Sequence, residues 1–162
     1  MIGMPGSGKT TLGEQLADNL VVEFVDLDVE IEKQESKSIP EIFRTKGEDY
    51  FREIESQVLL RWAALTKSFV MATGGGTPCF YQGIDVINRT GISVFLDVPV
   101  KDIVKRLSSS KNRPLLQTND DVEREERLKK ILESRITIYD QATIRLHSPT
   151  ADELLKAVRV KN

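Results

Sequence analysis

The sequence has 162 residues, of which 40% are hydrophobic and 30% are charged, and its formal net charge is −2. These values are typical of one globular domain and argue against a disordered chain, a membrane-spanning protein or a protein with a broad basic surface for nucleic acid. The single cysteine excludes an intrachain disulfide framework, and the single histidine excludes a histidine-rich metal cluster. We therefore expect residues 1–162 to form one domain of a monomeric cytoplasmic protein, with no membrane and no nucleic acid as partner.

The first motif runs from Gly3 to Thr10 and reads G-M-P-G-S-G-K-T. It matches the phosphate-loop pattern G-x-x-x-x-G-K-[ST], in which glycines let backbone N–H groups surround the phosphates of a nucleotide. In this pattern Lys9 reaches the β- and γ-phosphates and the hydroxyl of Thr10 binds Mg²⁺. Leucines at every fourth position then predict a helix over 9–20, whose N-terminus favours an anion. The residues predicted to bind the nucleotide here are Gly3, Pro5, Gly6, Ser7, Gly8, Lys9, Thr10 and Thr11.

Only Met1 and Ile2 precede this loop. A phosphate loop normally follows a buried strand of about five residues. The expected central strand is therefore a stub, and two interpretations stay open: upstream residues are missing from this chain, or a partial strand suffices.

Two carboxylates, Asp26 and Asp28, end the next predicted strand, residues 24–28. Ligands of parallel α/β sheets bind at the carboxyl ends of the strands, so these side chains are expected near the phosphate loop. Asp26 is the best acid to hold Mg²⁺ together with Thr10, because oxygen ligands suit that ion and no clear carboxylate ends the later strand at 69–73. The alternative is that both residues only form a turn.

Residues 38–65 predict two helices separated by Gly47. The segment S-I-P-E at 38–41 is a capping box that opens a short helix toward Phe43, and apolar residues at helical spacing predict a longer helix over 51–65. Arg52 lies beside Phe51 on that helix, and Glu55 follows three residues later. A buried arginine braced by a carboxylate suits bidentate recognition of a substrate carboxylate, whereas an exposed i, i+3 pair is the alternative.

The rest of the chain alternates strands with helices. We expect strands at 69–73, 92–96 and 143–146, and helices at 84–87, at 100–107, at 122–139 and after residue 150. Gly74, Gly75 and Gly76 follow the first of these strands and allow a ligand to approach the backbone, although a flexible loop would also explain them. Short apolar strands that alternate with helices predict an α/β fold, with helices on both faces of a parallel sheet.

A polar loop over 108–119 contains Arg113, which precedes a proline. This arginine either closes over the transferring phosphate as part of a mobile lid or is a solvated surface residue. Arg135, in the helix that follows, is equally ambiguous. We interpret Cys79 and His147 as structural residues.

Together these motifs resemble those of the shikimate kinases, a family of nucleoside-monophosphate-kinase-like phosphate-loop enzymes. The resemblance spans nearly the whole chain and rests on the phosphate loop, D-L-D at 26–28, F-R-E-I-E at 51–55, G-G-G at 74–76, R-P-L-L at 113–116 and R-x-x-x-Y at 135–139. It implies a three-layer α/β/α fold with a five-stranded parallel sheet, a mobile lid over 108–120 and a substrate-binding helical region over 29–65. It also implies transfer of the ATP γ-phosphate to the 3-hydroxyl of shikimate, with Mg²⁺ as cofactor.

The resemblance further implies a role for each candidate residue. Lys9, Asp28 and Arg113 would be catalytic, with Asp28 orienting or deprotonating the attacking hydroxyl and Arg113 contacting the phosphates of ATP. Thr10 and Asp26 would hold the metal, and the segment of Ser148 and Pro149 would flank the adenine. The substrate-binding residues would be Asp28, Phe43, Phe51, Arg52, Glu55, Gly74, Gly75, Gly76 and Arg135. Among these, the two arginines would hold the shikimate carboxylate, Glu55 would orient Arg52, and the phenylalanines would line an apolar wall.

Two other functions stay open at this point. One is a small-molecule kinase of similar fold that acts on another hydroxy acid, such as gluconate, although D-L-D, G-G-G and R-P-L-L would not be expected together in it. The other is a nucleotide-binding regulatory module without turnover, which would not need the paired substrate arginines.

Overall fold

The computed structural model describes residues 1–108 and 121–161. The helices are α1 (Lys9–Leu20), α2 (Leu27–Glu35), α3 (Ile39–Ala63), α4 (Gly83–Thr90), α5 (Val100–Ser108), α6 (Asp121–Tyr139) and α7 (Ala151–Lys161), with a 3₁₀ helix, η1 (Thr77–Cys79), before α4. The strands are β1 (Glu23–Asp26), β2 (Phe69–Ala72), β3 (Val94–Asp97) and β4 (Ile144–His147). None of the helices in these two ranges is long and apolar enough to cross a membrane.

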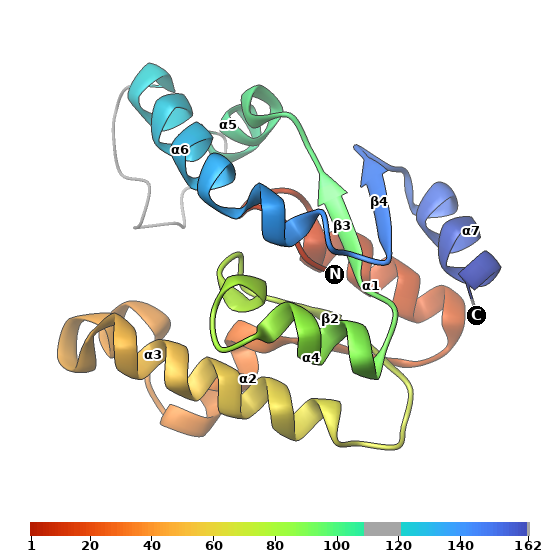
Figure 1. Ribbon diagram of the computed structural model, residues 1–162, viewed down its shortest axis with the longest axis horizontal. Coiled ribbons are helices and arrows are strands. Elements are labelled where there is room, and N and C mark those ends of the chain that lie inside the picture. Colours follow the sequence, from red (N-terminus) through yellow and green to blue (C-terminus); the bar gives the residue numbers. More distant parts are fainter. Residues whose placement is uncertain (109–120, 162) are drawn as a thin grey trace.

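The four strands form two parallel pairs, and the N-terminus lies between them (Figure 1). β1 pairs with β2, and β3 pairs with β4. The amine of Met1 donates to the carbonyl oxygen of Met71 in β2 at 2.7 Å, and the amide of Ile2 donates to the carbonyl oxygen of Val94 in β3 at 2.8 Å. The first two residues therefore connect the two pairs by backbone hydrogen bonds.

This dipeptide stands where a central strand was expected. Ile2 makes one parallel bridge to Phe95, and at Gly3 the backbone turns into the phosphate loop with a φ of 137°. In the part of the chain that the structure describes, the strands form two two-stranded sheets, which Met1 and Ile2 connect. The predicted five-stranded sheet is not present as one continuous sheet in these residues. The physical reason is that two residues are too few to form a full strand before the turn.

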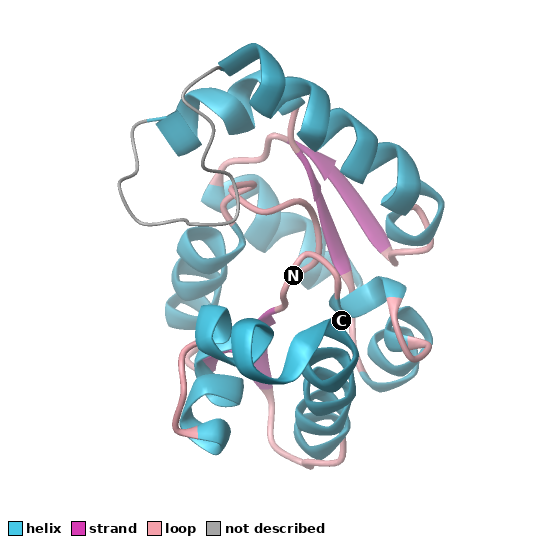
Figure 2. Cartoon of the chain, turned by 90° about the vertical axis from the view of Figure 1, so that its left-hand side faces the viewer, coloured by secondary structure: helices cyan, strands magenta, loops and turns pink. Residues whose placement is uncertain are grey.

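Apolar side chains project from both faces of the strands, because successive residues of a strand point to opposite sides. On one face Val94 and Leu96 pack with Leu16 of α1 and Leu154 of α7. On the other face Phe95 packs with residues of α4, α5 and α6. Helices therefore cover both faces (Figure 2), which is the α/β layering that the alternation of elements predicted.

The segment after β1 differs from the prediction. The strand ends at Asp26, and Asp28 lies in the first turn of α2, because the carboxylate of Asp26 caps that helix by accepting from the amide of Asp28 at 3.1 Å. α3 is interrupted at Gly47, where φ is 85°, and this break lies where two separate helices were predicted. The other predicted helices and strands are present with small shifts at their ends.

A cavity of about 540 Å³ lies beside Met1, at the amino ends of the strands. Its apolar lining comes from the start of β2 and β3, from α1 and from α7. Met1 is itself buried there, and burial, followed by the charge of Lys9, lowers the pKa of its amine to about 5. The surroundings of this amine therefore disfavour its charged form.

Candidate active site

The phosphate loop opens α1 at the carboxyl ends of the strands. Gly3, Gly6 and Gly8 have φ values of 137°, 80° and 97°, which only glycine adopts without strain. Lys9 is buried, and its Nζ donates to the carbonyl oxygens of Gly3 at 3.1 Å and Met4 at 2.9 Å. The residues predicted to hold phosphate, 3–11, thus form one continuous turn at a helix N-terminus, a favourable place for an anion.

Two oxygen-bearing side chains meet beside this loop. The hydroxyl of Thr10 donates to Oδ2 of Asp26 at 3.0 Å; Thr10 is exposed and Asp26 is half-buried. Mg²⁺ is usually bound by one or two protein oxygens, with water and phosphate oxygens completing its octahedron. The pair therefore fits the predicted metal site.

A cavity of about 460 Å³ lies over the N-terminus of α1. Ser148 and Pro149, predicted to flank adenine, line it together with the phosphate loop. Arg106 of α5 also lines it, and its Nη1 donates to the carbonyl oxygen of Ser7 at 3.2 Å. The sequence analysis missed Arg106, whose only signal was a cationic residue at the end of the helix before the polar loop.

Arg52 is nearly buried and donates hydrogen bonds to two carboxylates. Its side chain is 11% exposed, and its Nη1 donates to Oε2 of Glu55 at 2.8 Å. The other oxygen of Glu55, which is 2% exposed, accepts from the hydroxyl of Thr77 at 2.6 Å. Nε and Nη2 of Arg52 both donate to Glu48, at 3.2 and 3.1 Å. The exposed-pair alternative for Arg52 is therefore wrong, and Thr77 and Glu48 are partners that the sequence analysis missed.

The three glycines after β2, Gly74–Gly76, bring the predicted substrate-binding residues together. A Cβ atom placed at position 74 would lie 2.7 Å from Oε1 of Glu55, and one at position 76 would lie 2.5 Å from Nη1 of Arg52. A Cβ at position 75 would lie 3.2 Å from Nη1 of Arg135. Because these three glycines carry no side chains, their backbone comes into direct contact with Arg52 and Arg135. The alternative that residues 74–76 form only a flexible loop is therefore excluded.

A hydrogen bond from Tyr139 connects α6 to this loop. Its hydroxyl donates to the carbonyl oxygen of Gly75 at 2.6 Å, and burial raises the pKa of Tyr139 to about 12, so the donor stays protonated. Arg135 lies one turn earlier on α6. Cys79 is half-buried nearby, and burial raises the pKa of its thiol.

The two phenylalanines predicted to line an apolar wall have their rings in tilted contact. The rings of Phe43 and Phe51 lie 4.6 Å apart, and the guanidinium of Arg52 lies over Phe51 at 5.0 Å. Phe80 covers the same guanidinium at 4.4 Å and was not identified from the sequence. Arg113, the predicted lid arginine, lies outside the described residues.

With this geometry in place, comparison with known proteins identifies the family. The family model for shikimate kinase matches residues 5–158. The chain belongs to the shikimate kinase family. A shikimate kinase from Clostridium botulinum (strain Okra / Type B1) is 40% identical, over an alignment that covers 98% of this chain and 92% of that protein.

Two solved shikimate kinases share its fold. The enzyme from Bacteroides thetaiotaomicron superimposes with a TM-score of 0.89 at 37% identity, covering 99% of this chain and 93% of that chain. The enzyme from Acinetobacter baumannii, solved in complex with shikimate, gives a TM-score of 0.89 at 34% identity, covering 99% and 92%. The predicted α/β shikimate kinase fold is therefore confirmed.

Proposed function

We propose that this protein transfers the γ-phosphate of ATP to the 3-hydroxyl of shikimate, giving shikimate 3-phosphate and ADP. The observation that carries the proposal is the convergence of Arg52, Arg135 and Asp28 on the loop 74–76. A Cβ at position 74 would lie 3.2 Å from Oδ1 of Asp28, and one at position 75 would lie 3.0 Å from Cδ of Pro5 in the phosphate loop. The acid-binding and phosphate-binding groups are therefore neighbours.

Recognition of the acceptor would depend on its carboxylate. Planar guanidinium groups bind a carboxylate through two parallel hydrogen bonds, and a buried, already oriented arginine loses little freedom on binding. Glu55 supplies that orientation for Arg52. With the acid end held there, a ring hydroxyl would face Asp28, which would orient it or accept its proton. Phe43 and Phe51 would contact the apolar side of the ring.

Binding of ATP would use the phosphate loop and the cavity beside it. Lys9 and the backbone amides would contact the β- and γ-phosphates, and Ser148, Pro149 and Arg106 would surround the base. Thr10 and Asp26 would hold Mg²⁺, which neutralises charge on the phosphate oxygens when bound. Arg113 would add a further positive charge at the transferring phosphate.

The proposal has structural consequences beyond the site. Met1 and Ile2 would act as the middle member of a five-stranded parallel sheet, which the hydrogen bonds to β2 and β3 support. Residues 29–65 would form the substrate-binding helical region of a single domain, whereas residues 109–120, in which the predicted lid falls, lie outside the described residues. The enzyme would work as a monomer in the cytoplasm.

ADP release in the presence of shikimate, of gluconate and of no acceptor tests this function. With ATP present in every assay, we expect rapid ADP release only when shikimate is the acceptor. In that assay ³¹P NMR should identify a phosphate ester at the 3-hydroxyl. Release with gluconate only would indicate a kinase for another hydroxy acid. Binding of ATP without acceptor-dependent release would indicate a regulatory module.

A further inference from the structure

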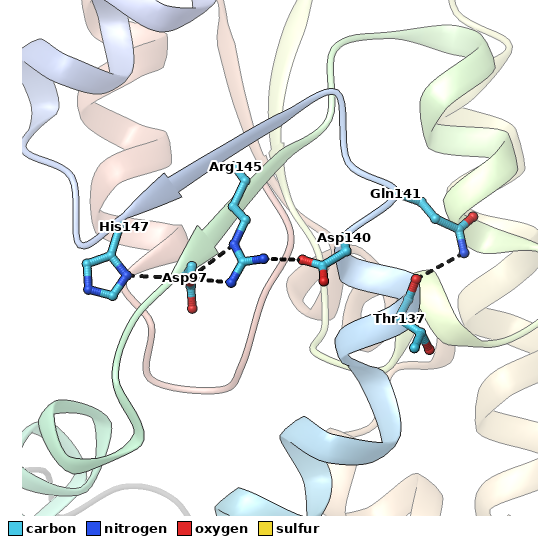
Figure 3. Close-up of polar contacts among 6 residues, drawn as sticks. All are labelled: Asp97, Thr137, Asp140, Gln141, Arg145 and His147. Atoms are coloured by element: carbon cyan, nitrogen blue, oxygen red, sulfur yellow. Dashed lines mark hydrogen bonds and ion pairs between the residues drawn. The ribbon is translucent and has the colours of Figure 1, made fainter.

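A cluster of ionic side chains joins the last residues of β3 and β4 (Figure 3). Asp97 ends β3 opposite His147, which ends β4. Oδ2 of Asp97 accepts from Nε and Nη2 of Arg145 at 3.1 and 2.8 Å, and Nδ1 of His147 lies 3.4 Å from the same oxygen. Nη1 of Arg145 donates to Oδ1 of Asp140, just after α6, at 2.7 Å. Arg145 therefore connects the ends of both strands with the end of α6.

The cluster continues directly into the wall of the 460 Å³ cavity. Val98 follows Asp97, and Ser148 and Pro149 follow His147, and all three line that cavity. The amide of Ser148 also donates to the carbonyl oxygen of Asp97 at 3.0 Å. Arg145 does not line the cavity, so any effect it has on a bound nucleotide passes through its neighbours.

The turn at Ser148 depends on its surroundings. Its φ is 44°, in the left-handed region, which is unfavourable for a residue other than glycine. Such a conformation persists only where neighbouring contacts hold it. The bond to the carbonyl of Asp97 is one such contact, and the two N–H groups that Arg145 directs at the carboxylate of Asp97 fix that residue beside β4.

We propose that Arg145 is a positioning residue for the nucleotide base. By holding Asp97 beside β4, it keeps the turn of Ser148 and Pro149 against the cavity, and it thereby strengthens binding of the adenosine part of ATP without affecting the triphosphate. This inference rests on the proposed function, because it takes the cavity as the ATP site.

Loss of this ion pair should leave the fold nearly intact. Arg145 is 51% exposed and Asp97 18%, and an ion pair with one exposed side chain contributes little to stability. A change in nucleotide binding can therefore be separated from unfolding. The phosphate loop itself is held by other contacts, namely those of Lys9 and Arg106.

The test compares two ligands that differ only in the adenosine part. Isothermal titration calorimetry gives the dissociation constants of ATP and of inorganic tripolyphosphate, both as Mg²⁺ complexes. It is carried out on the unsubstituted protein, on Arg145→Ala and on Arg159→Ala, which removes an exposed arginine of α7. We expect Arg145→Ala to weaken ATP binding about tenfold and tripolyphosphate binding less than about twofold. Arg145→Lys should restore only part of the loss, because an ammonium cannot direct two N–H groups at Asp97 in the same fork. Arg159→Ala should change neither constant.

Equal weakening of both ligands, or unchanged ATP binding in a folded Arg145→Ala protein, would overturn the inference. Should Arg145→Ala fail to fold, Asp97→Asn keeps the size of the side chain and gives the same comparison. ATP binding no tighter than tripolyphosphate binding in the unsubstituted protein would also overturn it. If the unsubstituted protein bound neither ligand, the proposed function would fail instead.

Discussion

Gly76 faces the guanidinium of Arg52 so closely that no side chain fits between them. A Cβ at position 76 would lie 2.5 Å from Nη1 and 2.7 Å from Cζ. The guanidinium is already bonded to Glu48 and Glu55, so it can move aside only by giving up those hydrogen bonds. The orientation of the acid-binding arginine therefore depends on the absence of a methyl group.

Gly76→Ala should raise KM for shikimate about ten- to a hundredfold. The reason is that a shift of the Arg52 guanidinium by about 1 Å misplaces both of the hydrogen bonds that it would donate to the shikimate carboxylate. The φ of Gly76 is −87°, which alanine adopts without strain, so the protein should fold. Steady-state kinetics give the result, and Gly91→Ala is the matched control, since no atom lies within 4 Å of a Cβ there. An unchanged KM in Gly76→Ala would show that Arg52 does not bind the acceptor.

Arg52→Lys and Arg135→Lys should each raise KM for shikimate strongly while KM for ATP changes little. The charge is kept, so the loss isolates the bidentate contact, and full truncation to Ala should be worse, at about 2–5 kcal/mol. Arg61→Lys, on the exposed side of α3, serves as the control. A shikimate analogue without its carboxylate should bind poorly and respond to neither substitution. If both variants kept the original KM, the role in acid recognition would be wrong.

Lys9→Met should lower kcat by about 10²–10³-fold or more, because a positive charge at the β- and γ-phosphates is lost from a buried site. Methionine keeps the unbranched apolar stem but not the two hydrogen bonds of Nζ, so the protein should fold with a lower melting temperature. The exposed Lys156→Met is the control. Retention of most of kcat would contradict the assignment of the phosphate loop to catalysis.

Extra apolar residues placed before Met1 should stabilise the protein. An extended segment there would continue between β2 and β3 into the 540 Å³ cavity and bury its side chains against the apolar lining. An extension of about three β-branched residues should raise the melting temperature by about 5 °C. A glycine–serine extension of the same length is the control, and equal effects of the two would contradict this account of the cavity.

In a chain of residues 1–162 alone, stability should depend on pH through the buried amine of Met1. Its pKa is about 5 in the fold and has the ordinary value of 8.0 in the unfolded chain. Between these values unfolding takes up a proton, so the free energy of unfolding should rise by about 4 kcal/mol from pH 5 to pH 8 and level off above. Urea unfolding across this range measures the slope. The glycine–serine extension lacks this amine and should flatten the curve, whereas equal slopes in both chains would assign the effect to another group.

Features that depend on a few adjacent residues were predictable from the sequence. The phosphate loop is one, because three glycines and a helix start determine its shape, and the meeting of Thr10 with Asp26 follows from where parallel strands end. The pairing of Arg52 with Glu55 was predicted from their spacing, but its burial was not. That burial depends on Thr77 and on a loop more than twenty residues away, which is why the alternatives stayed open until the structure was known.

Contacts between distant segments could not be predicted in this way. Arg145 and Asp97 are 48 residues apart, and Arg106 and Ser7 are 99 apart, with no periodicity to connect them. The end of β1 was misplaced for a different reason. Asp26 could either extend the strand or cap the next helix, and its bond to the amide of Asp28 decides for the cap.

Gly75 lies next to residues of both substrate sites, the phosphate loop and the acid-binding arginines. A Cβ there would lie 3.0 Å from Cδ of Pro5 in the phosphate loop and 3.2 Å from the guanidinium of Arg135. A compound that carries a carboxylate and a polyphosphate on one short linker could therefore occupy both regions at once, with the second contact made at high effective concentration. Such bisubstrate inhibitors would gain their affinity from groups that two separate ligands otherwise supply, and a rigid linker shaped to pass Gly75 is the natural starting point for their synthesis.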